Sequence, residues 1–515
     1  MQPPQACLVG DFPGVACAWH YVNMSELTIT TQLSAIEGFG GIDADADDLL
    51  KACFEDHNAY VSARDLAKFL VLGRKGSGKT AIYKRLITEH GGNTFSLGHS
   101  FDDYPWHHHD LQAEVGVPEE RRYIHSWKYM ILLGVAKVLL NNDQSQPWSD
   151  DSADAMSVLE DFVVDSYGSR DPDMRQLFSP EKQLRFKGSM DLKVLQIGVE
   201  SVLVRDLPIH IQSVNKAMQE HIFRALNPDS TYYICFDQLD LGFSTTDSTY
   251  GQRLIGLLVA ARDLFVAAKN AGKRFSPVVF LRDDIFQDLQ FEDKNKILEN
   301  FATKIAWTES GSGLTLKSLM ERRFEEVLGS DSKPPITWAD VFDETQEMPG
   351  RQTKYKHLCD RTLLRPRDMI KLCNEVLASH NADNKIGKFD NASVHAARES
   401  YSDYLLNEID DEIAKHVPEY KEYLEVVKAV GAEKFELEQF AEGFSLRASL
   451  SATSPTDALA DLFAFSIVSY LKPGGRGGGS EYVWRYKDPR ARFDATATSF
   501  RVHPGFKETL GLLTR

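Results

Sequence analysis

The sequence predicts an α/β protein in which helices cover a mainly parallel sheet. The apolar run Phe69–Leu72 leads into a glycine-rich loop and then an amphipathic helix, the order expected for a buried strand and its turn. Two further runs, Tyr232–Phe236 and Val278–Leu281, are apolar or aromatic throughout and end in charged residues. Strands with both faces buried in a parallel sheet have this composition. Binding side chains are expected at their carboxyl ends.

The composition is that of a globular protein with several domains. The chain has 515 residues, 43% hydrophobic and 26% charged, which suggests about two to four domains. Its formal net charge is −17, whereas a protein that coats duplex nucleic acid is usually basic. No apolar run approaches the roughly 20 residues of a membrane span.

The cysteines and the first residues predict a cytoplasmic protein. The six cysteines form no C-x-x-C pair, and Cys235 lies inside a predicted strand, so we expect reduced thiols. Residues 1–18 lack the basic and apolar regions of a signal peptide. Residues 1–48 are expected to form a partly irregular N-terminal arm, and Met24 is an alternative start. The acidic run 43–48 is expected to cap a helix over 49–57.

Residues 73–80 match the pattern G-x-x-x-x-G-K-[ST]. Glycines allow backbone N–H groups to turn toward a polyphosphate, and the helix that follows adds the partial positive charge of its N-terminus. Lys79 is expected to reach the β- and γ-phosphates, and the Thr80 hydroxyl to ligate Mg²⁺. A chance glycine-rich turn is the weaker alternative, because strand, Lys-Thr pair and helix are all in place. The predicted nucleotide-binding residues of this loop are Gly73, Arg74, Lys75, Gly76, Ser77, Gly78, Lys79 and Thr80.

The stretch between this helix and the next core strand is expected to be an insertion, around residues 99–225. It contains the consecutive histidines 107–109, which point in different directions on a helix or strand and so rarely share one metal. A helix is expected over 123–140, a hairpin over 184–204 and a helix over 214–226.

The strand that ends in Asp237 is expected to supply the acid that holds Mg²⁺ through water, opposite Thr80. Gln238 stands where many ATPases place a catalytic glutamate, and it can orient a water molecule without taking its proton. Asp240 is the next carboxylate, either a catalytic group or a cap of the loop that follows. The identity of the general base therefore stays open.

Several arginines are candidate phosphate sensors. Arg282 follows the strand Val278–Leu281 and is expected to sense the γ-phosphate, with a salt bridge to Asp283 or Asp284 as the alternative. Arg322 and Arg323 lie on a helix expected over 307–328, after a turn at Gly311 and Gly313. They form either an arginine finger or a solvated basic face.

A second helix start carries two more arginines. Pro366 suits the first turn of a helix, so Arg365 and Arg367 lie at its mouth, where a lid can contact a nucleotide phosphate. A purely structural role for both is the alternative. Residues 311–400 are expected to form a helical lid, and the loop 329–352 a hinge or partner surface.

The C-terminal part, residues 401–515, is expected to resemble a winged helix. A helix over 457–471, a glycine-rich tip at 474–479, strands over 482–486 and 499–502, and a final helix after Pro504 suggest this fold. The end of the chain is locally basic, which permits contact with nucleic acid or, more in keeping with the net charge of −17, with a protein. The basic residues are Lys472, Arg476, Arg485, Lys487, Arg490 and Arg492.

The motifs at 73–80, 233–240, 280–285 and 365–368, in this order, resemble a bacterial family of P-loop ATPases near the KAP and STAND branches of the AAA+-like ASCE class. The similarity runs from about Phe39 to the C-terminus. It implies a P-loop core over 49–310, a helical lid and a winged-helix-like tail. Members are commonly regulatory or antiviral-defence ATPases that assemble and act through a partner or fused effector.

The resemblance thus implies Mg·ATP as ligand, a homo-oligomer and a protein partner. The departure at Gln238 bears on the rate of hydrolysis more than on nucleotide binding. Two alternatives to a slowly hydrolysing switch remain, a nucleotide-gated scaffold with little turnover and a DNA-directed motor or clamp loader that uses the basic C-terminal hairpin.

Overall fold

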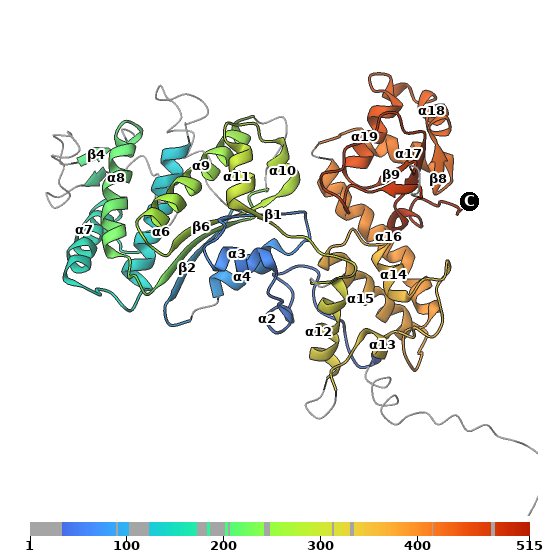
Figure 1. Cartoon of the computed structure of the whole chain (residues 1–515), viewed down its shortest axis with the longest axis horizontal. Coiled ribbons are helices and arrows are strands. Elements are labelled where there is room, and N and C mark those ends of the chain that lie inside the picture. The colour runs from blue at the N-terminus through green and yellow to red at the C-terminus, as the bar shows by residue number, and fades with distance from the viewer. Residues whose placement is uncertain are drawn as a thin grey trace, which may run out of the picture.

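The computed structural model describes residues 33–88, 91–101, 123–172, 183–185, 201–203, 207–240, 248–311, 314–329, 334–414, 416–474 and 479–514. Within these ranges the chain is a mixed α/β protein. A sheet covered by helices lies on the left of Figure 1, and a helical part followed by a smaller C-terminal part lies on the right. No helix in these ranges is both long and apolar enough to cross a membrane.

A parallel sheet of five strands in the order β2-β5-β6-β1-β7 forms the centre of the first part. The expected strands are present, and β5 and β6 are buried along their whole length, as their apolar sequences predict. The register pairs Gly73 with Arg282 and Ser100 with Asp237, so the carboxyl ends of neighbouring strands meet at one edge. The strands are β1 (Leu70–Gly73), β2 (Thr94–Ser100), β5 (Thr231–Asp237), β6 (Phe275–Arg282) and β7 (Ala302–Lys304).

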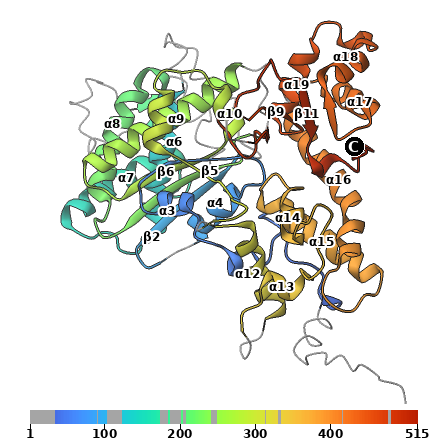
Figure 2. The ribbon, with the colours of Figure 1, turned by 45° about the vertical axis from the view of Figure 1, so that its right-hand side comes forward.

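Helices cover both faces of this sheet (Figure 2). On one face α6 (Ile124–Asn141), α7 (Asp150–Tyr167), α8 (Leu207–Ala225) and α9 (Ser248–Asn270) share the largest hydrophobic cluster with the strands. On the other face lie α3 (Asn58–Arg64) and α4 (Lys79–Thr88). The expected insertion around 99–225 is therefore no separate unit, because its helices supply much of the core that covers the sheet.

The helical part contains α12 (Leu316–Leu328), α13 (Trp338–Val341), α14 (Lys354–Cys359), α15 (Pro366–Ala382) and α16 (Asn391–Ile413). The C-terminal part contains α17 (Tyr420–Val430), β8 (Lys434–Glu436), α18 (Leu437–Ser445), α19 (Pro455–Ala464), β9 (Val468–Lys472), β10 (Glu481–Val483) and β11 (Ser499–Val502). Its strands form an antiparallel sheet in the order β10-β9-β11-β8. One hydrophobic cluster joins both parts.

The structure corrects several expected boundaries. The limit between lid and C-terminal domain, placed at residue 400, falls inside α16, which is continuous from residue 391 to residue 413. The helix expected over 307–328 begins only at Leu316. The helix expected over 49–57 is only the short α2 (Leu50–Cys53), whose N-cap residue makes no side-chain capping bond, and α3 begins at Asn58, beyond the expected end.

The C-terminal expectations also need correction. The apolar stretch 457–471 is not one helix, because α19 ends at Ala464 and β9 begins at Val468. Pairing of β9 with β10 and β11 outweighs the helical pattern of its last residues. The final helix is only a 3₁₀ turn, Pro504–Phe506. In contrast, the expected hairpin is present as the antiparallel pair β3 (Gln183–Arg185) and β4 (Ser201–Leu203).

Some sequence predictions lie outside the described residues. These are the histidines 107–109, the start of the N-terminal arm with Met24, and Arg476. Among the residues that the structure does describe, no group of three or more His, Cys, Asp or Glu side chains is arranged to hold a metal ion.

Candidate functional site

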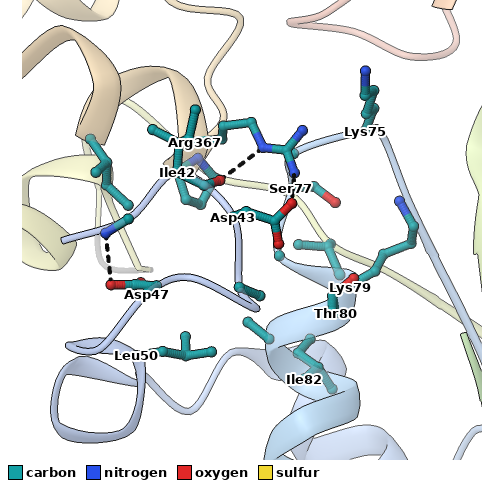
Figure 3. Close-up of a pocket in the computed structure, with 18 of the residues that line it drawn as sticks. Ile42, Asp43, Asp47, Leu50, Lys75, Ser77, Lys79, Thr80, Ile82 and Arg367 are labelled. Atoms are coloured by element: carbon teal, nitrogen blue, oxygen red, sulfur yellow. Dashed lines mark hydrogen bonds and ion pairs between the residues drawn. The ribbon is translucent and has the colours of Figure 1, made fainter. Parts of the chain in front are cut away.

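A cavity of about 490 Å³ lies at the carboxyl edge of the parallel sheet, between the glycine-rich loop and the helical part. Figure 3 shows Lys79 and Thr80 at the start of α4 on one side, with Ile42, Asp43 and Arg367 across from them. The predicted site residues that line it are Lys75, Gly76, Ser77, Gly78, Lys79, Thr80, Asp237, Gln238, Asp240, Arg282 and Arg367. Of the other predicted residues, Gly73, Arg74 and Arg365 are not part of its described lining.

The loop itself has the backbone that its glycines were expected to allow. Gly76 and Gly78 have φ angles of +74° and +105°, in the left-handed region that favours glycine. Lys79 Nζ donates to the carbonyl oxygens of Gly73 at 3.0 Å and Arg74 at 3.1 Å. Burial lowers the pKa of Lys79, and Asp240 and Asp237 oppose this shift.

Trp307 supports the loop from outside, a role that no sequence motif indicated. Its Nε1 donates to the carbonyl oxygen of Ser77 at 3.0 Å, and its ring lies 5.6 Å from that of His57. His57 Nε2 in turn lies 3.0 Å from the carbonyl oxygen of Ala306. The chain is not helical at Trp307, because α12 begins only at Leu316.

Asp237 lies at the same corner as Lys79 and Thr80. Thr80 and Asp237 both line the cavity, and the Thr80 side chain acts to lower the pKa of the Asp237 carboxyl. Burial raises the pKa of Asp237 to about 6, although Thr80 and Lys79 act in the opposite direction. Its Oδ2 is buried and has no hydrogen-bond partner among the described residues. A buried carboxylate oxygen with a free lone pair beside a hydroxyl is a donor set that fits Mg²⁺.

The next two candidate residues along the chain, Gln238 and Asp240, both form hydrogen bonds with other side chains. Gln238 has a φ of +60°, and its Oε1 accepts a hydrogen bond from the Ser100 hydroxyl at the tip of β2. Asp240 accepts from Arg282 at 3.3 Å. The side chain of Gln238 is therefore oriented by a neighbouring strand, a contact that sequence spacing did not indicate.

Arg282 forms the salt bridge that was its alternative role. Its Nε and one terminal nitrogen donate to the two carboxylate oxygens of Asp284 at 3.1 and 2.5 Å, and only 3% of its side chain is exposed. Burial opposes its charge, but Asp284, Glu412 and Asp240 together raise the pKa of Arg282. The guanidinium remains at the cavity wall, held between two acids.

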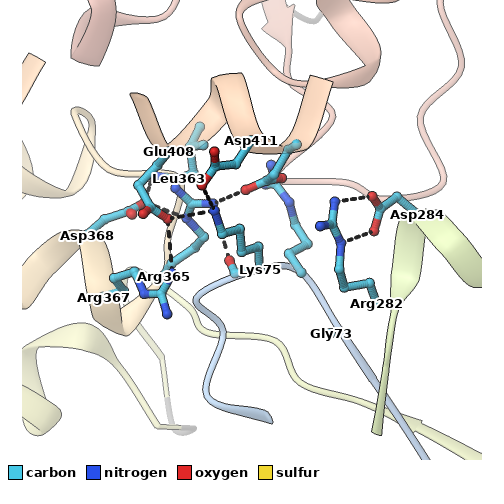
Figure 4. A network of polar contacts seen from close by, with 12 residues as sticks. Gly73, Lys75, Arg282, Asp284, Leu363, Arg365, Arg367, Asp368, Glu408 and Asp411 are labelled. Carbon is cyan, nitrogen blue, oxygen red and sulfur yellow. Dashed lines mark hydrogen bonds and ion pairs between the residues drawn. The ribbon is translucent and has the colours of Figure 1, made fainter. Parts of the chain in front are cut away.

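The two lid arginines have different surroundings (Figure 4). Arg365 is 1% exposed and donates to Asp368 at 2.8 Å, to Glu412 at 2.7 Å and to the carbonyl oxygen of Lys75 at 3.2 Å. It thus holds the loop backbone rather than facing the cavity. Arg367 faces the cavity and donates to the carbonyl oxygen of Ile42 at 2.9 Å and to Glu408 at 3.0 Å.

Arg322 and Arg323 differ in exposure, because Arg322 is exposed, as on a solvated face, whereas Arg323 is buried, and both are paired with acids. Arg323 is 4% exposed and donates to Asp47 at 2.6 Å and to the carbonyl oxygen of Phe39 at 2.9 Å. Arg322 pairs with Glu55 at 3.1 Å. Both arginines therefore hold residues 39–55, which form one wall of the cavity.

This wall is a part of the site that sequence reasoning missed. The acidic run 43–48 was expected to cap a helix, and one of its contacts fits that role, because the backbone N–H of Leu49 donates to Asp47 at 3.3 Å. Other residues of the run form ion pairs with distant residues. Asp45 pairs with Lys84 at 2.7 Å, and Asp43 lies 3.7 Å from Arg367. Only the fold brings these partners together.

Among the described basic C-terminal residues, Arg485 is partly buried, whereas the others are exposed. Arg485 donates to Gln287 at 2.7 Å and so joins the C-terminal part to α10 (Asp283–Asp288). Lys472, Arg490 and Arg492 are exposed. The helix α19 has Asp457 and Asp461 but no lysine or arginine.

Two comparisons with known proteins match parts of the chain. Residues 314–410 match the model of the FunZ-associated C-terminal helical domain. A 161-residue stretch is 26% identical to the putative transposon gamma-delta 80.3 kDa protein of Escherichia coli (strain K12). That stretch is 30% of this chain and 21% of the relative, so the match spans about a fifth of the relative's length. The first match extends from just before α12 into α16, close to the expected lid.

Proposed function

We propose that the protein is a P-loop ATPase that binds Mg·ATP in the cavity at the carboxyl edge of the sheet. In this proposal it hydrolyses ATP slowly and acts as a nucleotide-driven regulatory or assembly switch. The main support is that Lys79, Thr80 and Asp237 line the same cavity, where Asp237 Oδ2 is buried and has no hydrogen-bond partner among the described residues. A loop that presents amides, a lysine, a hydroxyl and a facing acid suits a magnesium-bound triphosphate.

Each residue of this corner has a defined role in the proposal. Lys79 exchanges its bonds to the carbonyl oxygens of Gly73 and Arg74 for β- and γ-phosphate oxygens. Thr80 and Asp237 hold the metal, which neutralises charge on the phosphates when bound. Gln238, fixed by Ser100, orients a water molecule but is a poor proton acceptor. Slow turnover follows from the lack of a strong base at this position.

The parts outside the core favour a switch. The helical part places Arg367 at the cavity, and one continuous helix, α16, leads from it toward the C-terminal part. The order helix, strand, two helices and hairpin in residues 420–483 supports a winged-helix-like domain. Its helix α19 is acidic, which favours a protein partner over DNA. A regulatory role, such as antiviral defence with an effector, suits this arrangement.

The first test is the substitution Lys79→Ala, with binding of Mg·ATP measured by calorimetry and turnover measured by phosphate release. Loss of charged hydrogen bonds to phosphate should weaken binding roughly 10- to 100-fold. Lys68→Ala is the matched control, because Lys68 also donates to two backbone carbonyl groups, at 3.1 and 2.7 Å, but at the opposite end of β1. Full affinity and full turnover in Lys79→Ala would refute the proposal.

A second candidate, a nucleotide-gated scaffold with little turnover, is favoured by the position of Gln238. The same phosphate-release assay, run with ATP and with ATP plus a candidate partner, separates the two. A switch that hydrolyses ATP releases phosphate faster with its partner, whereas a scaffold changes its assembled mass on binding ATP without release. A DNA-directed motor would instead show DNA-stimulated turnover that disappears when residues 472–492 are neutralised.

A further inference from the structure

The cavity proposed for a triphosphate has acidic side chains on the side of α16. Glu408 and Asp411 line it together with Lys75, Lys79 and Arg367. A triphosphate carries several negative charges, and like charges at short range repel each other strongly where water is partly excluded. These carboxylates therefore oppose phosphate binding unless they move away from the cations that phosphate needs.

The contacts show which cations these acids occupy. Lys75 Nζ lies 2.8 Å from Asp411 and 3.6 Å from Glu408, and Arg367 donates to Glu408 at 3.0 Å. Figure 4 shows Glu408 and Asp411 on α16 directed toward Lys75. The side chain of Glu408 is 17% exposed, so this pair of contacts is partly shielded from solvent. One carboxylate thus neutralises both the loop lysine and the lid arginine that face the cavity.

We propose that Glu408 is an autoinhibitory contact that occupies the phosphate-facing cations Lys75 and Arg367, so that nucleotide binding has to displace α16. This inference rests on the proposed nucleotide site and describes its regulation. Asp411 contributes a second, more exposed contact to the same lysine. Residues three and four apart lie on one face of a helix, so Glu408, Asp411 and Glu412 approach the loop together.

Displacement of α16 should also affect the C-terminal part, because α16 leads directly into it. Glu412, which is buried, remains bonded to Arg365 and so forms a pivot next to the loop. Just beyond the end of α16, His416 lies 3.6 Å from Asp284 and 3.3 Å from Asp288, on the helix that follows Arg282. Rotation of α16 about Glu412 would alter these contacts between the C-terminal part and the core. Release of Glu408 is thereby transmitted to the C-terminal part.

The first arm of the test is the affinity of the full chain for Mg·ATP, measured by calorimetry for wild type and Glu408→Gln. Glutamine keeps the size of the side chain and removes its charge. Affinity should rise about threefold to tenfold, the range for one charge interaction at a partly exposed position. Asp403→Asn is the matched control, because it removes one charge from an exposed position of α16 outside the cavity and should leave affinity unchanged.

The second arm needs no nucleotide. Amide hydrogen exchange of the apo chain should be faster in residues 404–414 and around Lys75 in Glu408→Gln, and unchanged in Asp403→Asn. Unchanged exchange, or unchanged or weaker affinity of Glu408→Gln beside a wild type that binds, would overturn the autoinhibitory contact and leave the ATPase proposal standing. Absence of binding in both wild type and Glu408→Gln would overturn the two proposals together.

Discussion

At the scale of single residues, the most informative group is Asp237. It lies at the end of a buried strand, is 2% exposed, and has one oxygen without a partner among the described residues. Its pKa is raised because burial removes the carboxylate from water at the tip of β5. The sequence predicted its position, because an acid after five apolar residues is a local pattern. The burial that raises its pKa depends on the helices around it.

The pKa of Asp237 leads to a pH prediction for Mg²⁺. Because its carboxyl pKa is raised to about 6, protons compete with the metal below that pH. Mg²⁺-dependent ATP binding should weaken about tenfold for each pH unit below 6 and level off above it. Magnesium titrations at pH 5 and pH 7.5 measure this effect. In Asp237→Asn the pH dependence below 6 should be shallower than in wild type, because the contribution of this carboxyl is removed, and a slope like that of wild type would contradict the assignment.

At the scale of elements, the start of α15 shows how similar residues acquire different roles. Pro366 begins the helix as the sequence predicts, and Arg365 and Arg367 flank it. Arg365 lies in the interior, where Asp368 and Glu412 satisfy it, whereas Arg367 lies at the cavity beside Glu408. Although they are only two positions apart, Arg365 is structural and Arg367 is a candidate phosphate-binding residue. The sequence left both roles open because the partners come from α16.

Substitution of these two arginines should lower the free energy of unfolding by very different amounts. Arg365→Ala leaves Asp368 and Glu412 buried without their cation and should lower the free energy of unfolding by about 3–5 kcal/mol. Arg367→Ala breaks a more exposed pair and should cost only about 0–1 kcal/mol. Chemical denaturation of the two variants gives the comparison. Equal destabilisation would mean that the difference in burial does not govern their energetic roles.

At the scale of the whole molecule, the contact around His416 joins the C-terminal part to the sheet-containing part. Its imidazole lies near Asp284 and Asp288 of α10 and packs against Phe465, with ring centroids 5.5 Å apart. The two carboxylates beside the ring raise the pKa of His416 to about 9, although burial acts against the shift. Asp284 also binds Arg282, which lines the cavity, so Asp284 connects His416 to the cavity wall.

The raised pKa of His416 predicts that docking of the C-terminal part weakens at high pH. Its ordinary value is 6.5, so the stabilisation is fully present below pH 6.5 and is lost as pH rises through 9. For a half-buried pair we expect on the order of 1–2 kcal/mol. Small-angle scattering and limited proteolysis between pH 6 and pH 9.5 would detect the loosening. His416→Gln should remove the pH dependence; a profile like that of wild type would exclude this contact as its source.

The sequence alone determined the features that depend on residues close together along the chain. Loop glycines, the Lys-Thr pair, the acid after an apolar strand and proline at a helix start are short patterns whose geometry follows from backbone chemistry. Only the tertiary structure decided which charges meet. Lys75 and Asp411 are 336 positions apart, and Arg323 meets Asp47 across 276. No local pattern specifies such partners, because an arginine pairs with whichever acid the packing of helices brings within reach. The same nonlocal packing made residues 39–55 a wall, joined the expected insertion to the core, and turned the end of an apolar helix pattern into β9.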